Sequence, residues 1–301
     1  MTERSRDVPT EPLESILYRD LSKVEAKPLV EIASPLLQEL VNYGSGALAR
    51  CAASASGGPD EDLAILALYR HVIEMADGVD VLLSQACCTP AIPLVRGSFE
   101  ALLSIEYILE QPQEYTRRSL SWLVGYVHQR LDMYHRLDST TPKGKQFKAV
   151  LDEDEAASRI RLPPLDELQR AAGNLESLLA KPHLRPVEAE FKRHRRTPRW
   201  HALFRGPPTL LALAERLHRG AQYEMLYRYW SRIAHAQDAL GLIATGRLRD
   251  PRELVGIATF TSTFVLRATR LVIARLRPGE DLRPWYIREV RPHLSRLRRL
   301  P

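Results

Sequence analysis

The chain of 301 residues has few cysteines and no long apolar run. Its three cysteines, Cys51, Cys87 and Cys88, are an odd number, and adjacent cysteines are badly placed to bridge each other, which argues against a disulfide framework. The longest uncharged run without proline covers residues 254–266, whereas a membrane-spanning helix needs about 20 apolar residues. The polar N-terminus also lacks the apolar core of a signal peptide. We therefore expect a cytoplasmic protein without a membrane span.

Sequence motifs for cofactors and metals are also missing. There is no Gly-x-Gly-x-x-Gly and no phosphate-loop Gly-Lys-Ser/Thr pattern, which disfavours the dinucleotide and nucleoside triphosphate folds. The cysteines lack the Cys-x-x-Cys spacing of zinc sites. The single Glu215-x2-His218 pair falls short of the two such pairs and further glutamates that a di-iron bundle needs. We expect no cofactor and no metal.

Basic charge is abundant but unevenly placed. The chain has 36 arginines against 7 lysines, which together with its many alanines and leucines suggests a GC-rich bacterial genome. Residues 1–180 carry 18 basic and 27 acidic side chains, a net charge of −9, whereas residues 181–301 carry 25 basic and 10 acidic side chains, a net charge of +15. Such asymmetry predicts RNA or another anionic partner for the C-terminal half, the acidic half of a second copy in a homodimer, or neutralisation within one fold.

Helical periodicity dominates the chain, and no alternating run of β-branched residues indicates a strand. Proline and glycine punctuate the pattern where helices should begin or end. The fold class expected is therefore all-α, an antiparallel helical bundle with additional peripheral helices. The predicted helices cover residues 11–25, 29–53, 60–85, 92–110, 113–137, 145–159, 165–179, 186–194, 208–219, 222–245, 251–276 and 284–300.

These helices suggest three parts. Residues 1–58 form N-terminal helices packed on the bundle, residues 59–279 form the main helical domain, and residues 280–301 form a basic C-terminal helix. We expect the central bundle to use residues 60–137 and 222–276, with residues 145–194 packed around it.

One polar stripe runs along the predicted helix 222–245. Glu224, Arg228, Ser231, His235 and Asp238 are spaced four, three, four and three residues apart, which places them on one helical face. Most such stripes are solvated faces, but this combination also allows a catalytic site.

A second set of polar residues lies on two strongly apolar helices joined by a short turn. Because unpaired charges inside a bundle are costly, we expect them to form a paired network inside it. The alternative is a pocket that they line. The network consists of Arg70, Glu74, Asp77, Arg96, Glu100 and Tyr107.

A third candidate is the stretch 191–206, where basic side chains alternate with aromatic ones. This composition suits single-stranded nucleic acid, through phosphate contacts and base stacking. The alternative is a surface linker that Trp200 anchors to the bundle. The candidate nucleic-acid contacts are Lys192, Arg193, Arg195, Arg196, Arg199 and Trp200.

The order of these motifs resembles a known family. The Arg70-x3-Glu74 helix, the Arg96-x3-Glu100 helix with Tyr107, the later Trp200 and the Tyr227-x3-Ser231-x3-His235 helix are similar to the bacterial helical domain-of-unknown-function family 5677. The resemblance covers roughly residues 60–245. It implies an all-helical cytosolic protein, and it implies no activity.

A weaker resemblance concerns mechanism. Arg228-x6-His235 is similar to the Arg-x4-6-His pattern of the HEPN helical ribonucleases, which cut RNA without metal. A histidine near neutral pKa can remove the 2′-hydroxyl proton, and an arginine can stabilise the charge on the phosphate. The spacing occurs five times in this chain, so spacing alone does not decide.

Three hypotheses follow from these patterns. The first is a non-catalytic interaction or regulatory protein whose polar network specifies packing. The second is a metal-independent ribonuclease, of the defence or toxin type, that uses Arg228 and His235, with Ser231 beside them. The third is a binder of a small anionic ligand, held by Arg70, Arg96 and Arg228. Whether the protein is an enzyme is left open.

Overall fold

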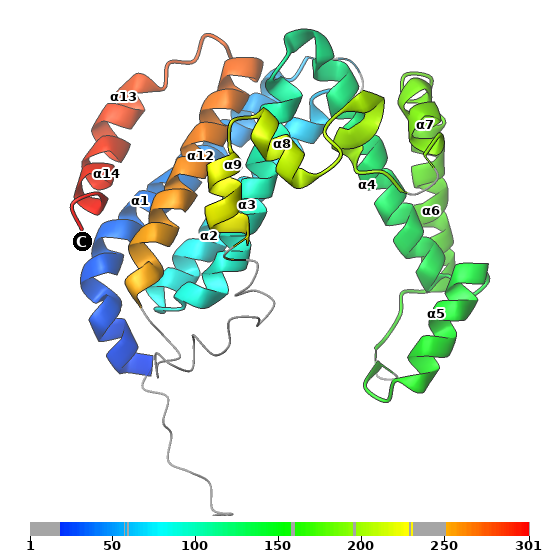
Figure 1. The fold of residues 1–301 in the computed structure, drawn as a ribbon, viewed down its shortest axis with the longest axis horizontal. Coiled ribbons are helices and arrows are strands. Elements are labelled where there is room, and N and C mark those ends of the chain that lie inside the picture. Colours follow the sequence, from blue (N-terminus) through cyan, green and yellow to red (C-terminus); the bar gives the residue numbers. More distant parts are fainter. Residues whose placement is uncertain are drawn as a thin grey trace, which may run out of the picture.

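All regular secondary structure that the structure describes is helical, as the periodicity predicts. The structure is a computed structural model that describes residues 19–56, 58, 60–157, 160–194, 197–228, 230 and 251–300. Figure 1 shows a bundle of long helices on one side and an arm of shorter helices on the other, with α4 between them.

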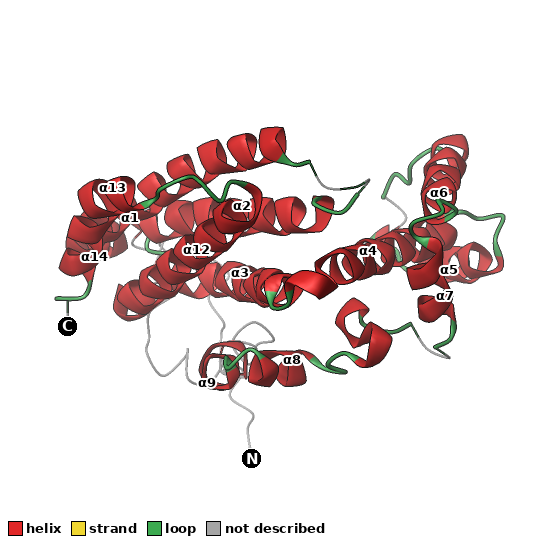
Figure 2. Ribbon diagram, turned by 90° about the horizontal axis from the view of Figure 1, so that it is seen from above, coloured by secondary structure: helices red, strands yellow, loops and turns green. Residues whose placement is uncertain are grey.

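Among the described residues, four long helices form the bundle: α1 (Arg19–Ser54), α2 (Leu63–Ser84), α3 (Cys88–Leu109) and α12 (Leu254–Leu276). α2 and α3 are antiparallel and joined by the short turn that the sequence predicts, and Figure 2 shows α12 beside both of them. The remaining elements are η1 (Pro112–Glu114), α4 (Tyr115–Leu137), α5 (Pro142–Glu153), α6 (Leu165–Leu179), α7 (Arg185–Lys192), η3 (Trp200–Arg205), α8 (Leu210–Arg216), α9 (Gly220–Gln222), η4 (Tyr223–Arg228), η5 (Pro251–Glu253), α13 (Arg283–Trp285), η6 (Tyr286–Val290) and α14 (Arg291–Leu297).

α1 is one helix where the sequence predicts two. The sequence predicts a break at Pro28, because a proline removes one helical hydrogen bond and clashes with the preceding turn. In the structure Pro28 and Pro35 both lie on the exposed face, while the buried stripe continues through Ala26, Ala33 and Leu40. Burial of that stripe offsets the lost hydrogen bonds, so α1 belongs to the bundle itself.

The centre of the bundle joins α2, α3 and α12. Tyr69 is fully buried, and its hydroxyl lies 2.8 Å from the hydroxyl of Thr269 on α12. Phe99 of α3 packs against Phe264 of α12 with ring centroids 5.6 Å apart. Burial raises the pKa of Tyr69, so it stays a neutral hydrogen-bonding phenol.

The arm has a small core of its own. α4 leaves the end of α3, and α6 and α7 pack against it through Leu123, Val127, Leu179, Val187 and Phe191. Residues 145–194 thus pack on α4, which the sequence predicts to be part of the central bundle; in the structure α4 instead leaves the bundle of α1, α2, α3 and α12. Their apolar side chains are covered by one face of α4, from Leu120 to Leu131, and the helix projects away from the bundle.

α12 is the one helix in the described residues that is long and apolar enough to cross a membrane by length and composition. More than half of its most apolar window, 56%, is buried inside the protein. This burial fits a central core helix, since α12 packs on α1, α2 and α3.

A carboxylate fastens the C-terminal segment to α1. Glu280 accepts hydrogen bonds from Arg50 Nη2 at 2.6 Å, from the Tyr43 hydroxyl at 3.3 Å and from Arg277. The hydrogen bond from Arg50, with help from Arg277, lowers the pKa of Glu280 from its ordinary 4.5 to about 2. The clamp therefore requires an ionised Glu280.

This lowered pKa predicts an acid-sensitive contribution to stability. It is fully present above pH 4.5 and is lost as the pH falls toward about 2, because protonation breaks the ion pairs. Glu280→Gln should lower the free energy of unfolding at pH 7 by about 1–2 kcal/mol, less than the shift alone implies because water screens the partly exposed Arg50. The difference in the free energy of unfolding between this variant and the wild type should shrink toward about pH 2, as measured by urea unfolding at a series of pH values.

A matched control is Glu74→Gln, which removes an exposed i,i+4 ion pair with Arg70. We expect a change of at most about 0.5 kcal/mol there. Equal effects of the two substitutions, or a Glu280→Gln effect that does not vary with pH, would contradict the clamp.

Candidate functional site

The C-terminal end of α3 gathers arginines from several elements. Glu106 is buried and accepts two hydrogen bonds from Arg219, at 2.7 and 3.1 Å, and one from Arg267 Nε at 2.8 Å. Arg219 comes from the α8–α9 junction and Arg267 from α12. A buried carboxylate is tolerated only with such partners, and two-atom contact with a guanidinium is the strongest form.

One turn later, Glu110 repeats the arrangement. Its Oε2 atom lies 2.9 Å from Arg118 Nη1 on α4 and 2.9 Å from Arg216 Nη2 on α8. Burial raises the pKa of Glu110, but the hydrogen bonds from Arg216 and Arg118 outweigh this effect and hold the pKa below its usual value. Glu110 therefore remains ionised and positions both arginines at the end of α3.

Tyr107 lies between these two carboxylates and faces a small cavity of about 150 Å³. Arg118 covers its ring, with the guanidinium carbon 4.0 Å from the ring centroid. Tyr107 is 5% exposed as a whole, and its hydroxyl, which stays accessible from the cavity, has no hydrogen-bond partner among the described residues. We call this cavity the arginine pocket; its lining is Tyr107, Gln111, Glu114, Arg117, Arg118, Ser121, Trp200, Leu203, Phe204, Arg205, Gly206 and Arg216.

A strained turn closes the pocket. Phe204 and Arg205 both have positive φ, 54° and 60°, which non-glycine residues rarely adopt. Such strain persists only where the surroundings impose it, and it is often found at functional positions. Glu190 of α7 accepts a hydrogen bond from the Phe204 backbone N–H at 3.2 Å.

The rest of the turn is held by close packing. His201 is buried and its Nδ1–H donates to the Pro207 carbonyl at 2.6 Å. Burial lowers the pKa of His201, so the ring stays neutral. A Cβ atom at Gly206 would lie 2.0 Å from the His201 carbonyl oxygen and 2.6 Å from the Tyr107 hydroxyl, so only glycine fits.

Arg205 differs from the other arginines of the pocket. Arg117 pairs with Glu114, and Arg118 and Arg216 pair with Glu110. The exposed Arg205 side chain has no acidic partner in the part of the chain that the structure describes. With four guanidinium groups near two carboxylates, the pocket keeps an excess of positive charge.

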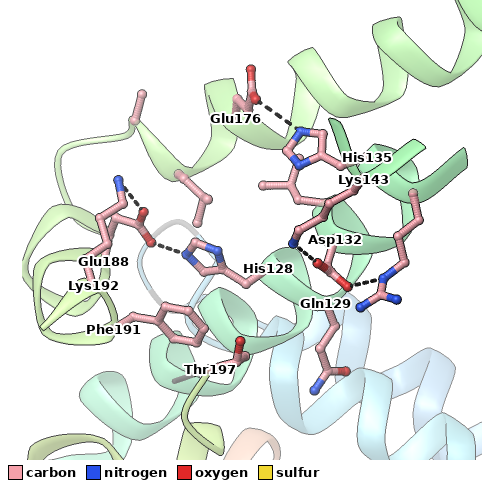
Figure 3. A pocket seen from close by; sticks show the side chains of 14 residues that line it. His128, Gln129, Asp132, His135, Lys143, Glu176, Glu188, Phe191, Lys192 and Thr197 are labelled. Carbon is pink, nitrogen blue, oxygen red and sulfur yellow. Dashed lines mark hydrogen bonds and ion pairs between the residues drawn. The ribbon is translucent and has the colours of Figure 1, made fainter. Parts of the chain in front are cut away.

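A larger cleft, of about 840 Å³, is lined by residues of α4, α6 and α7 (Figure 3). His128 Nε2 lies 2.6 Å from Glu188 Oε2, and its ring stacks on Phe191 with centroids 4.0 Å apart. Burial raises the pKa of Glu188, but Lys192 and His128 lower it further than burial raises it. These contacts fasten α7 to α4.

The other acids of this cleft are also paired. Asp132 contacts both Lys143 and Arg136, and Glu176 lies 3.9 Å from His135. No group of three or more histidine, cysteine, aspartate or glutamate side chains among the described residues could hold a metal ion. The charges of the cleft thus neutralise one another, and the arginine pocket is the stronger candidate for binding.

The predicted polar network forms ion pairs, but outside the bundle rather than inside it. Arg70 pairs with Glu74 at 2.7 Å, and their side chains are 70% and 51% exposed. Asp77 is also exposed. The face that α2 buries instead carries Tyr69, Val72, Ile73 and Ala76.

The α3 part of the network is better enclosed. Arg96 Nε lies 3.0 Å from Glu100, and Arg96 Nη2 donates to the Tyr227 hydroxyl at 2.6 Å. The guanidinium also covers the Tyr227 ring at 4.1 Å. Of the six predicted residues, Tyr107 reaches the arginine pocket, and the others do not line it.

The basic and aromatic stretch holds the turn in place. Trp200 packs on Tyr107 with ring centroids 5.8 Å apart, and its Cβ lies close over Gly125. This inward position is that of an anchor and leaves little face for stacking a base. Lys192 and Arg193 pair with acids of their own helix, Arg199 is exposed, and Arg195 and Arg196 lie outside the described residues.

Only part of the predicted catalytic stripe can be placed. Arg228 is 63% exposed and lies 3.1 Å from Glu224 on η4, with the buried Leu226 between them in sequence. Ser231 and His235 lie outside the described residues, as does Asp238.

Sequence reasoning missed Glu106, Glu110 and the arginines of the pocket. One signal was present: Arg117 and Arg118 follow Tyr107 across a short turn that contains Pro112, which brings the two helix ends together. No signal in the sequence marks Phe204 and Arg205 as residues with positive φ, since neither is glycine or asparagine.

Comparison with known proteins relates most of this region to one family. A family model described as a family of unknown function, DUF5677, matches residues 62–243. The chain belongs to this family. The DUF5677 match includes the whole arginine pocket and leaves out α1, α12 and the C-terminal segment. No curated protein and no solved structure matches the chain.

The close packing at Gly206 predicts that alanine substitutions at Gly206 and at Gly173 change the free energy of unfolding in opposite directions. Gly206→Ala should lower the free energy of unfolding by about 2 kcal/mol or more, because its Cβ would overlap the His201 carbonyl. Gly173→Ala, in helix α6 with no atom within 4 Å of the new Cβ, should raise it by about 0.5–1 kcal/mol. Thermal or urea unfolding of both variants measures this, and a neutral Gly206→Ala would show that the turn is looser than described.

Proposed function

We propose that the protein is a non-catalytic binding and regulatory protein, and that the arginine pocket binds a compact anionic group of the size of a phosphate. The observation that carries the proposal is the Tyr107 hydroxyl, which has no hydrogen-bond partner in the described residues and lines a cavity together with four arginines. An anion in the cavity would accept a hydrogen bond from this hydroxyl, and hydrogen bonds to charged groups are the stronger ones.

The charge of the pocket supports the same conclusion. Arg205 has no acidic partner in the described ranges, and the strained turn presents it at the pocket. Planar guanidinium groups suit phosphate and carboxylate oxygens because they donate two parallel hydrogen bonds. The volume of about 150 Å³ is several times the roughly 30 Å³ that one water occupies, which is enough for a phosphate group.

The position of the pocket suggests how a bound anion could change the surface that a partner protein recognises. Its walls come from the end of α3, the start of α4, the η3 turn and α8, at the place where the bundle meets the arm. An anion that contacts Tyr107 and Arg205 together would brace the η3 turn against α3. Binding would thereby stabilise one position of the arm, which a partner protein could recognise. The three free cysteines fit the reducing cytoplasm in which we place this role.

Titration calorimetry with inorganic phosphate and pyrophosphate tests the proposal. Arg205→Gln should weaken binding about tenfold, the cost of one hydrogen bond to a charged group. Tyr107→Phe should weaken it about threefold to tenfold, the cost of a weaker hydrogen bond. The matched control is Arg199→Gln, which removes an exposed arginine of the same segment that does not line the pocket.

Each outcome of this titration decides something. Wild-type affinity in Arg199→Gln with reduced affinity in Arg205→Gln supports a defined site. Equal losses in the two variants would mean general attraction to a basic surface, and no heat with wild-type protein would overturn the proposal. Melting curves of all variants confirm that they are folded.

A metal-independent ribonuclease is the second candidate. One observation favours it: Arg228 is largely exposed, so a phosphate of an RNA chain could reach it. We expect no cleavage of varied RNAs by wild-type protein in EDTA. Cleavage that disappears in both Arg228→Ala and His235→Ala, with both variants folded, would replace the binding proposal by the ribonuclease.

A further inference from the structure

A third cavity, of about 710 Å³, lies beside the bundle on the side away from the arm. It separates the middle and end of α12 from the C-terminal segment formed by α13, η6 and α14. We call it the C-terminal groove. It shares no lining residue with the arginine pocket, and it lies outside the residues that match DUF5677. Its size falls in the range of about 300–1,000 Å³ that is typical of small-molecule sites.

The walls of the C-terminal groove combine apolar side chains with polar and charged ones. Leu266 and Ile273 line it from α12, and Leu294 lines it from α14. Trp285 forms a further wall and is held in place by two contacts with α1. Its ring stacks on Tyr43 with centroids 3.7 Å apart, and its indole N–H donates to Glu39 at 2.6 Å. The groove is therefore already shaped before anything binds, which lowers the entropic cost of binding.

The rim of the groove carries unbalanced positive charge. The guanidinium groups of Arg270, Arg283 and Arg298 have no acidic partner in the ranges that the structure describes. Of the acids at the groove, Glu280 is engaged by Arg50 and Arg277, and Asp281 accepts the Arg283 backbone N–H at 2.9 Å.

We propose that the C-terminal groove binds a small amphipathic anion, an alkyl or acyl chain that ends in a carboxylate. The chain would lie against Leu266, Ile273 and Trp285 and so leave water, which is the main driving force for apolar ligands. The carboxylate would accept paired hydrogen bonds from Arg270 or Arg298 at the rim. This site is separate from the arginine pocket and does not depend on the function proposed there.

Three probes separate the two requirements of this site. Decanoate below its micelle concentration carries both the chain and the charge, decanol carries the chain alone, and acetate carries the charge alone. Titration calorimetry of the full chain should show saturable binding of decanoate at one site, with decanol and acetate each at least about tenfold weaker. Equal binding of decanoate and decanol would overturn the role of the arginines. Binding to vesicles with anionic lipid but not to decanoate would mean a membrane surface instead of a pocket ligand.

Variants then locate the site. Ala274→Phe places a ring in the groove from an exposed position and should abolish decanoate binding without disturbing the core. Arg270→Gln should weaken binding about tenfold. Arg299→Gln removes an exposed arginine of the same segment that does not line the groove, and it should bind like the wild type.

The two proposals can fail separately in the same set of experiments. Arg205→Gln should leave decanoate binding unchanged, and Ala274→Phe should leave phosphate binding unchanged. Decanoate binding that survives Ala274→Phe, in a variant that melts like the wild type, would place the ligand elsewhere and overturn the groove. The same conclusion follows if Arg299→Gln weakens binding as much as Arg270→Gln.

Discussion

The structure depends on two carboxylates at the end of α3. Glu106 and Glu110, one helical turn apart, tie this helix to α4, to α8, to the α8–α9 junction and to α12. Removing either acid would leave guanidinium groups without their carboxylate, which is costlier the more deeply they are buried. The arginines held in this way are Arg118, Arg216, Arg219 and Arg267.

These ion pairs explain why Tyr107 faces an arginine-lined cavity. Tyr107 lies between the two acids in the sequence and therefore lies close to the arginines that they bind. The η3 turn, with its strained backbone at Phe204 and Arg205, closes over Tyr107. Because α3, α4 and α8 all contribute, the pocket lies where the bundle meets the arm. The C-terminal groove has a different origin, since Trp285 and Glu280 hold the last helices against α1 and leave space beside α12.

Much of the fold could be predicted because the spacing of apolar residues along the chain shows which segments form helices with a buried face. The expected helices at residues 60–85, 113–137, 165–179 and 251–276 correspond closely to α2, α4, α6 and α12. Charged residues were harder, because an Arg-x3-Glu spacing is the same on an exposed face as on a buried one. Arg70 and Glu74 therefore looked like a core network, while Glu106 looked ordinary although it is buried. Which face of a helix is covered depends on distant segments, and a local pattern does not contain that information.

We propose above that residues at the end of α3 form an anion site around Tyr107. A crystal structure of the protein grown with phosphate tests it most directly. The account predicts a bound anion within hydrogen-bond distance of the Tyr107 hydroxyl and the Arg205 guanidinium, with Glu110 still holding Arg118 and Arg216. A pocket without an anion, or a Tyr107 hydroxyl bonded to a protein group instead, would contradict it.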